Sequence, residues 1–128
     1  MQVTVREVGE VLVMTLNGRL ILEEVEASLR GLLDPLIEQG HVKLVLDMHD
    51  VTYIDSAGLG YLISRYVRVQ RRGGDIKLVQ PTPRVAHVLE ITRLERVFEL
   101  YQSEEDAVRR FERARGRDTD PVLTSRRR

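Results

Sequence analysis

Hydrophobic and polar residues alternate along this chain with two different periods, and the period changes from one segment to the next. Near the start, apolar side chains occupy every second position, with Val3 and Val5 set against Thr4 and Arg6. This period is typical of a β-strand with one buried face. A second apolar run begins at Val11, after a glycine-containing turn. The two runs predict an antiparallel hairpin with a tight turn.

The pattern then changes to the helical period. Between residues 22 and 36, large apolar side chains recur every three or four positions, which predicts a helix with one buried face. Pro35 lacks an N–H and is expected to kink or split this helix near Asp34. Gly40 is placed to end it. The run Val42 to Met48 is almost continuously apolar, so we expect a central strand that is covered on both faces.

The rest of the chain continues to alternate between helix and strand. An opening hairpin followed by this alternation predicts an α/β fold with a mixed β-sheet and about four helices. We expect one domain over residues 1–112 of the 128-residue chain. The further elements expected are a helix from Ser56 that ends at Gly73-Gly74, a strand over 75–80, a helix entered through Pro81-Thr82-Pro83, a strand over 97–101 and a helix capped by Ser103.

The final segment, residues 113–128, has no such periodicity. Its only sizeable apolar residues are Val122 and Leu123, and three arginines occupy positions 126–128. This composition predicts a disordered basic tail. The arginines could contact nucleic acid or an acidic partner, or could be no more than solvated surface.

Overall composition narrows the classes of function. Twenty basic residues balance twenty acidic ones, so no global field attracts nucleic acid or an anionic membrane. Cysteine is absent, which fits a reducing compartment. No apolar run approaches the ~18 residues of a membrane helix. We therefore expect a cytoplasmic protein that neither inserts into a membrane nor binds nucleic acid directly.

Enzymatic chemistry has little support in the sequence. Ser56 lacks the first glycine of a Gly-x-Ser-x-Gly elbow, and the histidines at 41, 49 and 87 show no spacing that marks a catalytic base. A small hydrolase using Ser56 is therefore the weakest interpretation. No phosphate-binding loop or dinucleotide fingerprint is present, and no catalytic residue or cofactor is expected.

Three aspartates, Asp47, Asp50 and Asp55, could suggest a metal site with oxygen ligands. They are as readily explained as residues of the turns at strand ends, and no EF-hand loop surrounds them. We expect no metal site.

The most informative segment is Asp55-Ser56-Ala57-Gly58-Leu59-Gly60, between the apolar strand and the next helix. Ser56 can be a plain N-cap, which stabilises a helix by about 0.5–2 kcal/mol. A cap does not explain Gly58 and Gly60, each of which costs about 1 kcal/mol in a helix. A bare backbone beside a hydroxyl would let a partner approach closely and would accommodate a phosphate on the serine.

The segment from Leu46 to Gly60 resembles the STAS domain family, specifically the bacterial anti-sigma-factor antagonists. The order of the other elements is similar as well, including Gly18-Arg19-Leu20 before the first helix and Leu94 to Tyr101 before the last. The resemblance covers roughly Val3 to Phe111. It implies a STAS-like fold and a binding protein rather than an enzyme.

In that family the serine that matches Ser56 is phosphorylated by a partner that is both an anti-sigma factor and a serine kinase. A PP2C-type phosphatase reverses the modification. The unmodified antagonist captures the anti-sigma factor, so a sigma factor is freed and transcription is regulated. The resemblance therefore implies that Ser56 is the phosphorylation site.

Helical geometry indicates which neighbours would face the partner. If Leu59, Leu62, Ile63 and Tyr66 point inward, Tyr61 points outward, and we expect it to be an aromatic anchor. The same geometry turns Arg65 and Arg68 toward solvent. The residues expected to bind the partner are Asp55, Ser56, Ala57, Gly58, Leu59, Gly60, Tyr61 and Ser64.

One position departs from the family pattern. Ile21 stands where phosphorylated members usually carry an aspartate, which leaves a second function open. In this alternative the chain is a non-switching STAS scaffold, a subunit of a lipid-transport or stressosome-like assembly, and Ser56 is only a cap.

Overall fold

The computed structural model describes residues 1–118, and residues 119–128 of the predicted tail lie outside that range. Its centre is a five-stranded sheet in the order β1-β2-β3-β4-β5. β1 pairs with β2 in antiparallel orientation, and all other neighbouring pairs are parallel. The predicted hairpin and the mixed sheet are thereby confirmed. The strands are β1 Gln2–Val8, β2 Val11–Leu20, β3 Lys43–Ile54, β4 Asp75–Val79 and β5 Leu100–Tyr101.

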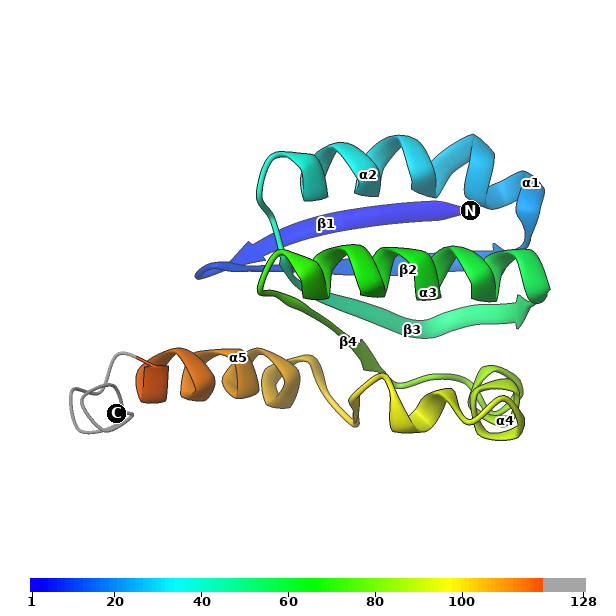
Figure 1. The fold of residues 1–128 in the computed structure, drawn as a ribbon. Helices are drawn as coiled ribbons and strands as arrows, with labels where there is room; N and C mark the ends of the chain where they lie inside the picture. Colours follow the sequence, from blue (N-terminus) through cyan, green and yellow to red (C-terminus); the bar gives the residue numbers. More distant parts are fainter. Residues whose placement is uncertain (119–128) are drawn as a thin grey trace.

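Helices connect the parallel strands, because strands that run in the same direction need crossover connections. The α2 and α3 helices cross the sheet side by side, and α5 runs separately below them (Figure 1). The helical elements are α1 Leu22–Glu24, the π-helical turn η1 Val25–Leu29, α2 Arg30–Glu38, α3 Ser56–Arg71, α4 Pro83–Ile91, the 3₁₀ turn η2 Leu94–Arg96, and α5 Glu104–Asp118.

Each face of the sheet has its own apolar core. Along β2, Leu12, Met14 and Leu16 belong to a large cluster that also includes apolar residues of η1, α2, α3 and α4. Val11 and Val13 point the other way and pack with Val108 and other residues of α5. This follows from the period of two in a strand. α5 is therefore the cover of the second face.

Two predicted details of the elements are wrong. The first helical region is not split near Asp34, since α2 runs unbroken from Arg30 to Glu38. Its irregularity is the π turn, where the Arg30 N–H donates to the Val25 carbonyl, and Pro35 lies within α2. The central strand also continues beyond Met48 to Ile54, because Val51 and Ile54 keep contributing to the core. β3 therefore runs to within one residue of Ser56.

The last helix is longer than the sequence pattern predicts. The expected domain boundary between residues 112 and 113 falls inside α5, which continues to Asp118. At its start, the Asp106 N–H donates to the Ser103 hydroxyl at 3.1 Å, which confirms Ser103 as the expected cap.

Candidate functional site

Ser56 lies at the carboxyl edge of the sheet, where two parallel strands end together. Leu20 of β2 pairs with Ile54 of β3, and the Asp55 N–H donates to the Leu20 carbonyl at 3.2 Å. The chain then turns directly into α3. The carboxyl edge is the usual place for binding sites in α/β sheets. The position of Ser56 is therefore fixed by backbone hydrogen bonds at the strand ends, with no long loop between β3 and α3.

The N-cap of α3 is Asp55, and the expectation that Ser56 is the cap is wrong. Asp55 has an extended backbone, with φ −111° and ψ −177°, and its Oδ1 accepts from the Gly58 N–H at 2.8 Å. Ser56 is the first residue of the helix itself. Ser56 is exposed, and its hydroxyl makes no hydrogen bond with residues 1–113, whose side chains the structure describes. The hydroxyl is therefore free to be modified without loss of the cap.

The two glycines of the segment have different roles. Gly58 is buried, and a Cβ there would overlap the carbonyl oxygen of Leu20. Gly58 thus lets α3 pack against the end of β2, so the prediction that it serves close approach of a partner is wrong. Gly60 is exposed, and a Cβ there would meet nothing within 4 Å. Of these two glycines, Gly60 is the one that presents bare backbone at the surface.

Tyr61 is not an outward anchor. It is buried, with 5% of its surface exposed, and its hydroxyl donates to Asp34 Oδ1 of α2 at 2.7 Å. The guanidinium groups of Arg65 and Arg30 both lie over its ring, at 4.6 and 5.0 Å from the ring centroid. The prediction fails because α3 is buried against α2 as well as against the sheet, which widens its buried arc.

Arg65 also differs from the expectation of a solvated side chain. Its Nε and Nη2 donate to the two carboxylate oxygens of Asp34 at 2.6 and 2.7 Å. Burial works to raise the pKa of Asp34, but hydrogen bonds from Arg65 and Tyr61 outweigh it and hold that pKa below its usual value. Asp34, Tyr61 and Arg65 thus form a network that holds α2 and α3 together.

The predicted partner-binding residues divide into two groups. Asp55 and Leu59 are half-buried, and Gly58 and Tyr61 are buried. The exposed members share one surface at the start of α3, which we call the α3 patch: Ser56, Ala57, Gly60 and Ser64.

One exposed aromatic residue beside the patch was missed by sequence reasoning. Tyr53, near the end of β3, is 41% exposed. The guanidinium of Arg84, at the start of α4, lies 5.4 Å from its ring centroid. The alternation of β3 gives no clear signal for this exposure, because its pairing with β2 is irregular between Thr15 and Arg19.

Ile21 belongs to the same edge. It follows Leu20 directly and is the N-cap residue of α1, with an extended backbone and no side-chain cap hydrogen bond. An aspartate at such a position would accept an N–H of the first turn. The departure from the family pattern therefore lies beside the α3 patch.

A group of titratable side chains lies on the α5 face of the sheet. The imidazole of His49 contacts Asp47 through Nδ1 at 2.7 Å and Asp50 through Nε2 at 3.1 Å. Burial works to raise the pKa of Asp47, but hydrogen bonds from Glu104 and His49 hold that pKa below its usual value. The hydrogen bond with Asp47 raises the pKa of Glu104. Among the described side chains, those of residues 1–113, no group of three or more acidic, histidine or cysteine residues could hold a metal ion.

The fold and the site together define a class: a small α/β module that presents a helix-start serine at the carboxyl edge of its sheet. The chain matches the STAS domain over residues 2–107 and belongs to that family.

Named relatives agree with this assignment. A Thermotoga neapolitana homolog of the protein TM1081, named as a candidate anti-sigma factor antagonist, is 32% identical over 101 residues, covering 79% of this chain and 89% of the relative. The anti-sigma-B factor antagonist of Bacillus subtilis is 35% identical over 80 residues, covering 62% of this chain and 72% of the relative.

The fold of this chain is also similar to that of a solved anti-sigma factor antagonist. The anti-sigma factor antagonist SpoIIAA in its unphosphorylated form superposes with a TM-score of 0.73 at 25% identity, covering 90% of this chain and 97% of that chain. None of the helices in the described part of this chain is long and apolar enough to span a membrane.

Proposed function

We propose that this chain is a cytoplasmic anti-sigma-factor antagonist that binds its partner through the α3 patch and is released when Ser56 is phosphorylated. The observation that carries the proposal is that the helix cap and the exposed hydroxyl at the start of α3 belong to two different residues. Asp55 caps the helix, so the neighbouring exposed hydroxyl of Ser56 is left for another use. Relatives named as anti-sigma factor antagonists support the choice of partner.

The physics of a helix N-terminus supports a switch that leaves the fold intact. A phosphate adds about −1.5 to −2 charges, and the exposed N–H groups of the first turn favour negative charge. The modified helix should therefore remain folded. If the added charge and bulk cost about 3 kcal/mol at the interface, affinity falls by more than about a hundredfold.

The partner set follows the family. The anti-sigma factor would carry the serine kinase activity, and a PP2C-type phosphatase would restore the unmodified state. The chain itself would act as a binding module and kinase substrate rather than as an enzyme. It would regulate sigma-dependent transcription without contacting nucleic acid.

Ile21 favours a second candidate. Because this N-cap position has no side chain that can accept a hydrogen bond, the acid that supports phosphorylation in other members is missing. A non-switching STAS scaffold, in a lipid-transport or stressosome-like assembly, would use the same patch to dock permanently. Glu23 follows within two residues and is exposed, so it is the nearest acid that could take over the role of the aspartate.

A comparison of bait proteins tests the proposal. Purified chain with Ser56, Ser56→Ala or Ser56→Glu is used to capture proteins from extracts of the native cell, with quantitative mass spectrometry. We expect a protein with an anti-sigma-factor kinase domain to be enriched by Ser56 and Ser56→Ala and depleted by Ser56→Glu. Thr4→Glu, on the exposed edge strand β1, is the charge-matched control and should capture normally.

The contrary result is also clear. Equal capture by Ser56→Glu and by the unmodified chain would overturn the switch. If the protein captured equally were a transporter permease or its ATPase, the scaffold would be the better account.

A further inference from the structure

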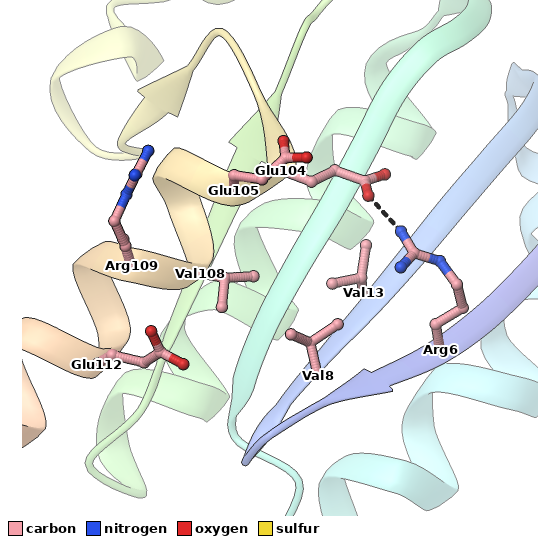
Figure 2. A pocket seen from close by; sticks show the side chains of 8 residues that line it. All are labelled: Arg6, Val8, Val13, Glu104, Glu105, Val108, Arg109 and Glu112. Carbon is pink, nitrogen blue, oxygen red and sulfur yellow. Dashed lines mark hydrogen bonds and ion pairs between the residues drawn. The ribbon is translucent and has the colours of Figure 1, made fainter.

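A hollow of about 380 Å³ lies on the α5 face of the sheet, on the side away from α2 and α3. It separates the β1-β2 hairpin from α5, as Figure 2 shows. Val8 and Val13 of the hairpin and Val108 of α5 form its apolar floor. We call it the hairpin groove. Nothing in the proposed antagonist function uses it, since the α3 patch is elsewhere.

The rim of the hairpin groove is charged. Both of its arginines are in ion pairs, but two of its acids are not. Arg6 reaches across one end and pairs with Glu104 (Figure 2). Arg109 pairs with Asp106 on its own helix. The two remaining acids of the rim, Glu105 and Glu112, have no ion pair within the described residues. The groove therefore combines an apolar floor with two uncompensated negative charges.

These features call for an occupant that carries small apolar side chains followed by positive charge. We propose that the hairpin groove binds residues 119–128 of the same chain, with Val122 and Leu123 on the valine floor and Arg126 to Arg128 near the acidic rim. In this segment Leu123 stands three positions before Arg126. Counted back along α5 from Asp118, Val108 comes before Glu105, so the order of apolar side chains and then positive charge matches this part of the groove, while Glu112 lies nearer the helix end.

The reach of the chain agrees with this placement. α5 ends at Asp118, and at about 1.5 Å per residue Val108 lies ~15 Å and Glu105 ~20 Å back along the helix axis. An extended chain spans at most ~3.3–3.6 Å per residue, so Leu123 can reach ~17 Å and Arg126 ~26 Å from Asp118. The apolar pair can thus meet Val108 while the arginines meet Glu105.

The sequence offers a direct test, because the chain contains no cysteine. Ser125→Cys in the full chain carries a single nitroxide spin label beside the proposed contacts. We expect the label to remove the methyl NMR signals of Val8, Val13 and Val108, and to leave those of Leu33 and Ile37, which belong to the core of the other face.

Charge variants test whether the signal loss depends on the acidic rim of the groove or is a general effect of the spin label. Glu105→Lys with Glu112→Lys should restore the three valine signals. Glu23→Lys with Glu90→Lys changes two exposed acids elsewhere and should leave the loss in place. Raising the salt from about 0.1 to about 1 M shortens the Debye length from ~10 to ~3 Å and should weaken the effect.

Two results would overturn the proposal. One is equal signal loss on both faces, or none in the groove. The other comes from mixing spin-labelled chain with isotope-labelled chain that has no spin label. If the valine signals are lost in this mixture as strongly as in the doubly labelled chain, the groove binds another copy and the intramolecular contact is wrong. Neither result depends on whether Ser56 is phosphorylated.

Discussion

At the residue scale, Gly58 and Gly60 lie in the same helix turn but differ in the space available for a side chain. Gly58→Ala would place a Cβ against the Leu20 carbonyl oxygen, and α3 cannot move away without breaking its contacts. We expect a loss of about 3 kcal/mol or more of unfolding free energy. Gly60→Ala points into open space and should add up to about 1 kcal/mol through helix propensity.

Urea denaturation of the two variants provides the measurement. Because they differ only in position, each serves as the control for the other. Similar stabilities for both would contradict the account of Gly58 as a packing residue.

Tyr61 supplies a second prediction at this scale. Tyr61→Phe keeps the contacts of the ring with Arg30 and Arg65 but removes the hydrogen bond to Asp34. We expect a loss of about 1.5 kcal/mol of unfolding free energy, at the low end for a bond to a charged group because Arg65 still pairs with that carboxylate. Denaturation measures the stability, and capture of the partner should be unchanged. A large loss of capture at normal stability would restore Tyr61 as an anchor.

At the element scale, the start of α3 depends on one side chain. Asp55→Ala removes the acceptor for the Gly58 N–H and should cost about 1 kcal/mol. Ser56→Ala should change stability by less than about 0.5 kcal/mol, as for other exposed positions without partners. Thermal unfolding of both variants checks the assignment. If Ser56→Ala were the more damaging change, the cap would belong to the serine after all.

Local sequence predicted the helices and strands well, but it did not predict which residues are buried by contacts between them. The hairpin, the strand and helix alternation, and the Gly40, Gly73 and Ser103 boundaries follow from period and from turn or cap chemistry, which are properties of neighbouring residues. The burial of Tyr61 depends instead on α2, which is distant in sequence. No spacing within α3 reveals that second neighbour.

The same distinction applies to the candidate site. The position of Ser56 at a strand-to-helix junction was correctly predicted. The role of Gly58 could not be, because it depends on the end of β2, which only the parallel pairing brings into contact. The exposed Tyr53 beside Arg84 was missed for a similar reason, since α4 supplies its partner.

A pH-dependent contact lies within β3, between His49 and Asp47. Hydrogen bonding to Asp47 raises the pKa of His49 above its usual value, against the opposing effect of desolvation. A raised histidine pKa means that protonation favours the folded state, so this contribution is complete below the unfolded pKa and is lost as pH rises through the folded one. NMR titration of the His49 ring should show the raised pKa, and Asp47→Asn should lower it. An unchanged pKa in that variant would contradict the pairing.

At the scale of the whole molecule, the two faces of the sheet are used differently. The helices α2 and α3 bury the larger core and hold the α3 patch at the carboxyl edge. The other face has a smaller core under α5 and leaves the hairpin groove open at its side. A modification at Ser56 would therefore alter a binding surface that lies on a rigid junction, with little effect on the rest of the fold.

The measurement that tests the central claim most directly is intact-mass and phosphosite analysis of the chain purified from its native cell under two growth conditions. The account predicts a phosphate on Ser56 whose amount changes with condition and which is absent in Ser56→Ala. A chain that stays unmodified at Ser56 under both conditions, while it still co-purifies with a stable partner, would contradict the switch and favour the permanent scaffold.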